Sequence, residues 1–259
     1  MVLTVDIGNS AIKIGAYNYN KELLFTNRIT TNRTCPVSDY AARLQDMCTL
    51  HNINRKEVEY IILSSVVPTV TTTFSEALHL VFKIHPQVLS QALQTGITVD
   101  IENPTELGSD ILASAVAIAA RFPLPSINID MGTATTITAL SADKRILGVS
   151  IATGAYTALD ALVGKAAQLQ GITIEAPPKA IGRNTVHSMQ SGAVFGNAAM
   201  LDGIIARFVQ EMGEVKTIVA TGGAGGNIIP HCQTPITYLP YILLDGLYEV
   251  YLMNKDVSC

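Results

Sequence analysis

The chain has 259 residues, of which 48% are hydrophobic and only 15% are charged. This composition supplies enough apolar side chains for two hydrophobic cores. The formal net charge of −4 provides no basic stripe that could neutralise phosphates, so we expect no nucleic-acid partner.

The sequence also allows an expectation of the cellular compartment in which the protein resides. No apolar run reaches the roughly 18 residues of a membrane-spanning helix, and no signal peptide precedes the first predicted strand. The cysteines fall in no paired or metal-ligand spacing and are expected to be reduced thiols; they are Cys35, Cys48, Cys232 and Cys259. We therefore expect a cytoplasmic protein without membrane association.

The first predicted elements form a β-hairpin. A strand over residues 1–6 ends in the turn Asp6-Ile7-Gly8-Asn9-Ser10, and strands over 10–18 and 21–30 follow. A carboxylate at a strand end, followed by glycine and hydroxyls, can hold a hydrated cation and let backbone N–H groups meet a phosphate. Lys13 is either a counter-charge to such a phosphate or a solvent-facing lysine.

Helical and strand patterns then alternate. Residues 38–51 predict an amphipathic helix with Ser38 as its N-cap. Residues 60–67 predict a buried strand that Pro68 terminates, and helical spacing resumes over 71–83.

The segment before the helix predicted over 111–120 carries an isolated acid. Gly108 and Ser109 precede the helix, and Asp110 lies in its first turn. Asp110 is either a helix N-terminal acid that the helix dipole stabilises or a general base at the mouth of a cleft between two lobes.

A second hairpin occupies residues 127–138. Its turn, Asp130-Met131-Gly132-Thr133, repeats the first Asp-x-Gly turn about half a chain length later. Glycine supplies the backbone conformation that such a turn requires. The repeat predicts two similar lobes that hold one nucleotide from opposite sides.

The remaining chain continues the strand–helix alternation. A strand over 145–150 and helices over 154–168 and 188–210 are expected, and a strand over 217–220 leads into a glycine-rich turn over 221–226 before a closing helix over 241–253. The helix over 188–210 carries small residues that suit either a helix-packed homodimer or packing within one chain; they are Gly192, Ala193, Gly196, Ala198 and Ala199.

These motifs together resemble a known superfamily. The turns at Asp6–Ser10, Asp130–Ala134 and Thr221–Gly223 resemble the phosphate-1, phosphate-2 and adenosine elements of the acetate/sugar kinase–Hsp70–actin superfamily. Within it, the chain is similar to type III pantothenate kinases over essentially its whole length. Further matching segments are Glu102-Asn103-Pro104, Leu107-Gly108-Ser109-Asp110, Ile181-Gly182-Arg183-Asn184-Thr185, Ser191-Gly192 and Leu243-Leu244-Asp245-Gly246-Leu247.

The resemblance implies an α/β fold of two ribonuclease-H-like (actin-like ATPase) lobes, with mixed sheets flanked by helices and a nucleotide cleft between them. The expected lobes are residues 1–108 and 109–259. The implied activity is ATP-dependent phosphorylation of pantothenate to 4'-phosphopantothenate, the first step of coenzyme A biosynthesis. It also implies Mg-ATP, a monovalent cation (potassium or ammonium) and a homodimer.

Site residues follow from the resemblance, position by position. Asp110 would be the catalytic base, Asp130 would hold the monovalent cation, and Asp6 would lie near Mg-ATP. The implied ATP-binding residues are Asp6, Ile7, Gly8, Asn9, Ser10, Ala11, Ile12, Lys13, Thr133, Gly222 and Gly223. The implied substrate-binding residues are Ile101, Gly108, Ser109, Asp110, Ile111 and Thr185.

Three departures concern the acceptor half. Ile111 stands where the family has arginine, Ile101 stands where it has tyrosine, and the Gly-Gly-x-Ile-x-Pro-Gly pattern is altered over 148–154. A lost arginine–carboxylate pair would cost on the order of 2–3 kcal/mol unless Arg183 or a cation from a partner subunit replaces it. Two alternatives stay open: a same-fold kinase for another small alcohol, and a nucleotide-binding regulatory protein with little turnover.

Overall fold

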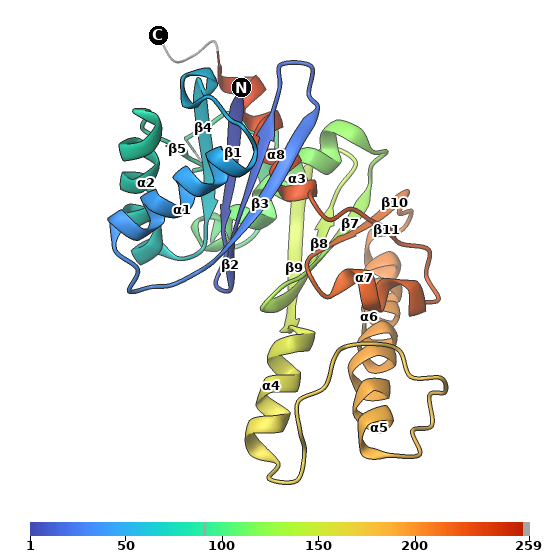
Figure 1. Ribbon diagram of the computed structural model, residues 1–259. Helices are drawn as coiled ribbons and strands as arrows, with labels where there is room; N and C mark the ends of the chain where they lie inside the picture. Colours follow the sequence, from blue (N-terminus) through green and yellow to red (C-terminus); the bar gives the residue numbers. More distant parts are fainter. Residues whose placement is uncertain (91, 256–259) are drawn as a thin grey trace. The chain divides into compact units, whose positions relative to one another are not determined.

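The computed structural model describes residues 1–90 and 92–255 (Figure 1). The chain divides into two compact units. The first holds residues 1–97, 103–120 and the C-terminal segment that begins at Ile242, and the second holds residues 98–102 and 121–241. The sequence-based boundary after residue 108 instead assigned the C-terminal segment to the second lobe. The C-terminal helix packs with the first sheet, a long-range contact that sequence order does not reveal.

The first unit contains a mixed sheet with the order β3-β2-β1-β4-β5. β1 pairs antiparallel with β2 and parallel with β4. The strands are β1 Val2–Ile7, β2 Ala11–Tyr17, β3 Leu23–Thr30, β4 Tyr60–Ser65 and β5 Gln87–Val88. β3 lies at one edge, and the central strand β1 is buried throughout.

Helices cover both faces of this sheet. Leu3, Val5 and Ile7 of β1 face the core formed with α1 and α2. The other face meets α8, whose Tyr248 stacks on Tyr17 of β2. The helices of this unit are α1 Val37–Leu50, η1 Arg55–Glu57, α2 Pro68–Phe82, η2 Pro104–Glu106, α3 Ser109–Arg121 and α8 Ile242–Asn254.

α8 packs closely against both the sheet and α3. Gly246 lies so close to the backbone carbonyl of Ala113 that a Cβ at this position would overlap it. The Tyr17 hydroxyl donates a hydrogen bond to Asp245 over 2.7 Å. The closing helix expected over 241–253 is therefore an integral layer of the first unit.

Two helix starts differ from expectation. The N-cap of α1 is Pro36, and Ser38 is already helical. α2 begins at Pro68 itself, because the missing N–H of proline is tolerated in the first helical turn. Pro68 thus ends the strand but also starts the helix that was expected at 71.

The second unit contains a mixed sheet with the order β11-β10-β7-β8-β9-β6. Antiparallel pairs β7–β8 and β8–β9 form a meander, and β10 adds parallel to β7. The strands are β6 Thr98–Val99, β7 Ser126–Met131, β8 Ala134–Leu140, β9 Arg145–Thr153, β10 Thr217–Thr221 and β11 Thr237–Tyr238. The strand–turn–strand repeat predicted from the Asp-x-Gly motifs is confirmed in both sheets.

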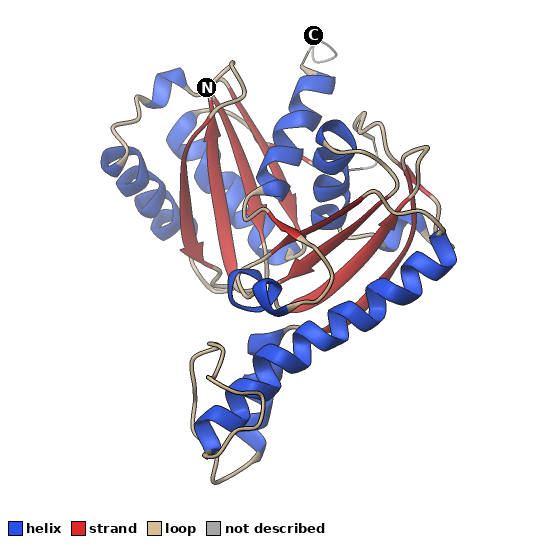
Figure 2. Ribbon diagram, turned by 90° about the vertical axis from the view of Figure 1, so that its right-hand side faces the viewer, coloured by secondary structure: helices blue, strands red, loops and turns tan. Residues whose placement is uncertain are grey.

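A long helical run dominates the rest of this unit (Figure 2). The run Thr185–Met212 spans 28 residues and includes a π-helical segment, η3, over Gly192–Gly196. The helices are α4 Ala155–Lys165, α5 Thr185–Ser191, η3 Gly192–Gly196, α6 Asn197–Met212, α7 Gly225–Ile228 and η4 Ile229–His231.

By length and composition alone, this run would also suffice to cross a membrane, although the sequence had suggested no such stretch. A single helix of this kind is weak evidence for a membrane span. Only 22% of its most apolar window is buried, so much of its surface is exposed.

Cys35, Cys48 and Cys232 are free thiols, as expected, whereas Cys259 lies outside the described residues.

Candidate functional site

The loop that joins β1 to β2 is held by hydrogen bonds from its own strands and from the segment after β3. The Gly8 amide donates to the Ala11 carbonyl at 3.0 Å. The Thr31 hydroxyl donates to the Gly8 carbonyl at 2.7 Å, and Arg33 donates to the Asn9 side chain at 3.1 Å. The predicted phosphate loop is therefore a supported turn at the carboxyl end of β1.

Asp6 and Lys13 form an ion pair beside this loop. Asp6 lies opposite Lys13 in the β1–β2 register, and Lys13 Nζ lies 3.8 Å from Asp6 Oδ2. The Asp6 side chain is 9% exposed and that of Lys13 is 33% exposed. Lys13 is thus fixed next to the carboxylate that was predicted to lie near Mg-ATP.

Asp110 is placed by the hydroxyl of its neighbour. Ser109 begins α3, and its Oγ lies 2.8 Å from Ser64 Oγ. The same oxygen accepts from the Ser65 amide at 3.0 Å and donates to the Ser65 carbonyl at 3.1 Å. Ser64 is the register partner of Asp6, so these bonds fix the start of α3 to the strand next to Asp6.

The Asp110 carboxylate itself lies in a desolvated position. Its Oδ1 accepts a hydrogen bond from the Ile111 amide at 2.9 Å. Burial raises the pKa of Asp110 above its ordinary value, and the opposing effects of that hydrogen bond and of the positive charge on Lys13 do not reverse the shift. A raised pKa and a nearby cation are properties of a general base.

Gly108 provides the space for this carboxylate. A Cβ at Gly108 would overlap Asp110 Oδ1. Gly108 therefore leaves space for the Asp110 carboxylate, and Ser109 anchors the start of α3.

The second unit carries the repeated turn at the carboxyl end of β7. The Gly132 amide donates to the Ala134 carbonyl at 3.0 Å, the counterpart of the Gly8 bond in the first unit. The Thr133 carbonyl accepts from the Gly154 amide at 3.1 Å and from the Thr157 hydroxyl at 2.7 Å. The start of α4 therefore fixes the backbone of Thr133.

The glycine-rich turn adjoins this loop. Thr221 at the end of β10 is the register partner of Asp130. Gly222 has φ +94°, and a Cβ there would lie 2.5 Å from the Met131 backbone. The Tyr238 hydroxyl donates to the Gly222 carbonyl at 2.9 Å. Asp130, Thr133 and the Gly222-Gly223 turn thus lie together at the carboxyl ends of the inner strands β7 and β10.

The described residues offer few metal ligands near the β1–β2 loop, which fits a magnesium ion that is coordinated mainly by nucleotide phosphates. In the described part of the chain, no three His, Cys, Asp or Glu side chains gather as a metal site. Mg²⁺ is commonly held by one or two carboxylates together with substrate phosphates and water, and Asp6 supplies such a carboxylate.

The predicted substrate residues are spread over several elements. Ile111 is buried in α3, with 9% exposure. Thr185 is exposed at the start of α5, where Asn184 caps the helix by accepting from the His187 amide. Ile101 belongs to the short segment 98–102 of the second unit.

Comparison with known proteins identifies the family. The family model described as type III pantothenate kinase matches residues 2–207. The chain belongs to the type III pantothenate kinase family. A type III pantothenate kinase from Exiguobacterium sibiricum is 38% identical over 98% of this chain and 100% of its own length. One from Dictyoglomus turgidum is 35% identical over 98% and 100%, respectively.

Solved structures support the fold alone, since their identities are low. A conserved protein of the Baf family of transcriptional activators from Campylobacter jejuni has a TM-score of 0.60 at 16% identity, over 98% of this chain and 99% of its own. The activator of 2-hydroxyisocaproyl-CoA dehydratase from Clostridium difficile, solved with ADPNP, has a TM-score of 0.56 at 10% identity, over 99% and 97%. The expected α/β architecture with two mixed, helix-flanked sheets is confirmed.

In this family member, sequence reasoning missed the supporting residues. Thr31 and Arg33 hold the first phosphate loop, and Ser64 and Ser65 anchor Ser109. The hydroxyl-rich end of the strand over 60–67 was the available signal. Its parallel pairing with the first strand, which brings it to Asp6, is a long-range contact.

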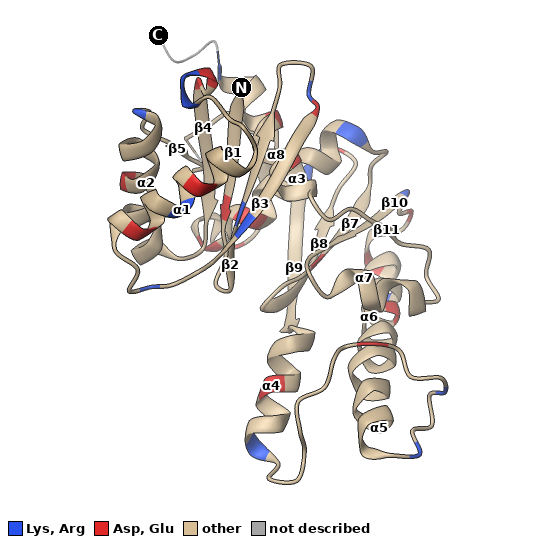
Figure 3. Cartoon of the chain, in the orientation of Figure 1, with Lys and Arg blue, Asp and Glu red and all other residues tan. Residues whose placement is uncertain are grey.

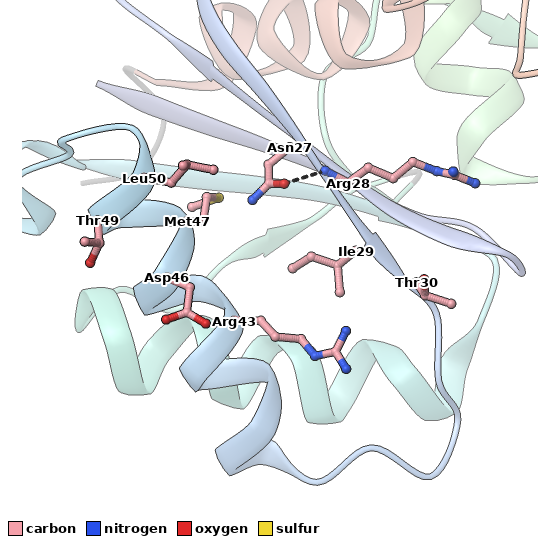
Figure 4. Close-up of a pocket in the computed structure, with 9 residues that line it drawn as sticks. All are labelled: Asn27, Arg28, Ile29, Thr30, Arg43, Asp46, Met47, Thr49 and Leu50. Carbon is pink, nitrogen blue, oxygen red and sulfur yellow. Dashed lines mark hydrogen bonds between the residues drawn. The ribbon is translucent and has the colours of Figure 1, made fainter.

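A shallow trough in the first unit contains none of the predicted site residues. It encloses about 550 Å³ between β3 and α1 and is lined by residues that include Ile29, Arg43 and Met47 (Figure 4). Ile29 belongs to the core on the α1 side of the sheet, whereas Asp6 lies on the opposite face. We therefore assign none of the site residues predicted from the sequence to this trough.

Proposed function

We propose that this protein transfers the γ-phosphoryl group of Mg-ATP to pantothenate, which gives 4'-phosphopantothenate and ADP in the first step of coenzyme A biosynthesis. Membership of the type III pantothenate kinase family carries this proposal. The local geometry agrees with it, because a desolvated carboxylate, Asp110, lies in the electrostatic field of Lys13 beside a supported phosphate loop.

Each group has a specific task in the proposed reaction. The pantothenate hydroxyl oxygen attacks the γ-phosphorus, its new O–P bond forms as the bond to the β,γ-bridging oxygen breaks, and Asp110 accepts the hydroxyl proton. The residues Asp6–Lys13 bind the triphosphate, while Thr133, Gly222 and Gly223 contact ATP. Magnesium, when bound, neutralises charge on the phosphates. Catalysis then rests on positioning and charge rather than on covalent chemistry by the protein.

The monovalent cation is the finer part of the proposal. Asp130 lies at the end of β7 next to a turn whose carbonyl groups are partly engaged by Gly154 and Thr157. A carboxylate next to backbone oxygens suits a weakly bound hard cation. We assign potassium or ammonium to Asp130.

The acceptor pocket differs from the family pattern. Ile111 is buried and offers no charge to a carboxylate. Arg183 is exposed and lies two residues before Thr185 in the sequence. We assign to Arg183 the pairing with the pantothenate carboxylate that arginine at position 111 would otherwise provide, and to Thr185 a contact with the same substrate.

We also propose a homodimer, which the long helix of the second unit supports. A Cβ placed at Gly192 or Gly196 would meet no atom within 4 Å. Packing within this chain therefore does not require these small residues, and the helix also exposes Val186 and Val209. Small residues in a helix permit close approach of a second helix, and we assign that role to the same helix of another copy in a cytoplasmic dimer.

ADP release tests the activity directly. The purified protein is incubated with Mg-ATP and potassium, with and without pantothenate, and ADP and phosphopantothenate are quantified. Equal formation of both products, dependent on pantothenate, is expected. ATP binding without pantothenate-dependent ADP release would contradict the proposal and would favour another acceptor alcohol or a regulatory nucleotide-binding role.

A further inference from the structure

The register of the first sheet brings a second cation next to Lys13. Arg28 on the edge strand β3 lies directly opposite Lys13 on β2, and Lys13 lies directly opposite Asp6 on β1. Asp6 in turn pairs with Ser64 on β4. Arg28, Lys13, Asp6 and Ser64 therefore form one row across four neighbouring strands, which we call the cross-strand row.

All members of the cross-strand row point to the same face. Side chains of directly opposite residues share a face, and successive residues in a strand alternate between faces. Ile29 points into the core with α1, so Arg28 points to the face of Lys13. Figure 4 shows the Arg28 side chain extending from β3 in the opposite direction to Ile29, although Arg28 is also one of the residues that line the trough. Figure 3 shows basic and acidic residues together across β1, β2 and β3.

The cross-strand row carries more positive than negative charge and could therefore bind an anion. Like charges directly opposite each other on neighbouring strands are destabilising. Asp6 balances Lys13 at 3.8 Å, whereas no carboxylate among the described residues forms an ion pair with the exposed Arg28. Lys13 therefore has Asp6 as its ion-pair partner and also acts electrostatically on Asp110. Arg28 is the cation of the row whose charge no ion pair among the described residues balances.

The position of the row identifies the anion. The row lies close to the β1–β2 loop. Arg28 is at one end of the row and Ser64 is at the other. Ser64 contacts Ser109, the residue before Asp110. If Asp110 accepts the proton of the acceptor hydroxyl, as in the proposed function, the end of the row with Arg28 faces the leaving side of the phosphate chain. A guanidinium suits this position because it can donate two parallel hydrogen bonds to phosphate oxygens.

We propose that Arg28 is a phosphate-binding residue that acts with Lys13 on the polyphosphate chain of the nucleotide. This inference rests on the proposed kinase function for its assignment of the anion. It extends the phosphate site from the β1–β2 loop to the edge strand β3.

The test compares Arg28→Gln, Arg28→Lys and a matched control, Arg43→Gln. Arg43 is exposed on α1 and lines the trough together with Arg28, but it is not a member of the row. Its replacement therefore removes the same charge from the same neighbourhood and controls for a general effect of charge near β3. Calorimetry measures the Kd of a non-hydrolysable Mg-ATP analogue and of adenosine, and steady-state kinetics give KM for ATP and for pantothenate. Melting temperatures verify that each variant is folded.

Arg28→Gln is expected to raise the Kd of the analogue and the KM for ATP about tenfold or more, which corresponds to one charge-assisted hydrogen bond. Arg28→Lys is expected to show a smaller increase, and Arg43→Gln none. Adenosine affinity and the KM for pantothenate are expected to stay unchanged.

Three results would overturn the inference: equal effects of Arg28→Gln and Arg43→Gln, an effect on the KM for pantothenate alone, or unchanged affinity for the analogue. The calorimetric readout does not require turnover. A protein that fails to phosphorylate pantothenate can therefore still confirm or refute the role of Arg28.

Discussion

At the scale of single residues, the site depends on an energetically costly carboxylate. Asp110 ionises less readily than an ordinary aspartate because burial raises its pKa. The folded state therefore holds the Asp110 proton more tightly than the unfolded state does. The resulting contribution to the free energy of unfolding is present at low pH and is lost as pH rises through the raised pKa.

Replacement of Asp110 by asparagine should therefore have opposite effects on activity and stability. Loss of the proton acceptor is expected to lower kcat by about 10²–10⁴-fold and to leave binding of a Mg-ATP analogue intact. At neutral pH, removal of the buried charge is expected to raise the melting temperature. Kinetics and thermal denaturation measure both; an unchanged kcat would refute Asp110 as the base.

A second residue-scale prediction concerns the space at Gly108. In Gly108→Ala, the new methyl group would displace the flexible carboxyl group of Asp110 rather than the backbone. Since a misplacement of about 1 Å can cost about 10²-fold in rate, kcat is expected to fall by about that factor while the fold and nucleotide affinity are kept. If kcat is unchanged, catalysis does not depend on this position of Asp110.

Sequence could predict Asp6, Asp110 and Asp130 as candidate site residues because each lies two residues from a glycine in a recognisable turn or helix start. It could not identify Arg28, Ser64 or Thr31. Their relevance depends on the register of β3 against β2, on the parallel pairing of β4 with β1, and on a hydrogen bond across 23 residues of chain. Such pairings are set by tertiary packing rather than by local pattern.

At the scale of elements, the two Asp-x-Gly turns are supported differently. The segment after β3 holds the first through Thr31 and Arg33. The start of α4 and the glycine-rich turn support the second through Thr133 and Met131. The repeated Asp-x-Gly motif predicted both hairpins, whereas these supports follow from the packing of elements distant in sequence.

The glycine-rich turn offers a matched pair of substitutions. Gly222→Ala would force a side chain into positive φ and against the Met131 backbone, whereas a Cβ at Gly223 meets no atom within 4 Å. We expect Gly222→Ala to lower the free energy of unfolding by about 2 kcal/mol or more and Gly223→Ala to change it by less than about 1 kcal/mol. Urea denaturation distinguishes them, and equal effects would contradict the close approach of β10 and β7.

At the scale of the whole molecule, the exposed helix of the second unit predicts self-association. The sequence left two interpretations of its small residues open, and the open space at Gly192 and Gly196 favours packing between copies. Gly196→Leu is expected to raise the dimer dissociation constant at least about tenfold. The unit itself should remain folded, because leucine has a higher helix propensity than glycine.

Sedimentation equilibrium across a concentration series measures this change. Gln45→Leu, an exposed site on α1 in the first unit, is the control for an added apolar side chain. A dimer that is unaffected by Gly196→Leu would refute this interface, and a monomeric wild-type protein would refute the dimer.

The position of α8 has a consequence for biosynthesis. β1 and the β1–β2 loop are translated before the second unit, whereas α8, which packs against β1, β2 and α3, is translated after it. A nascent chain that ends before Ile242 already contains all of the second unit, whereas the first unit still lacks one layer. The first unit, whose translation begins before that of the second, is therefore completed after it, so Asp110 on α3 acquires its full surroundings only once α8 has been made.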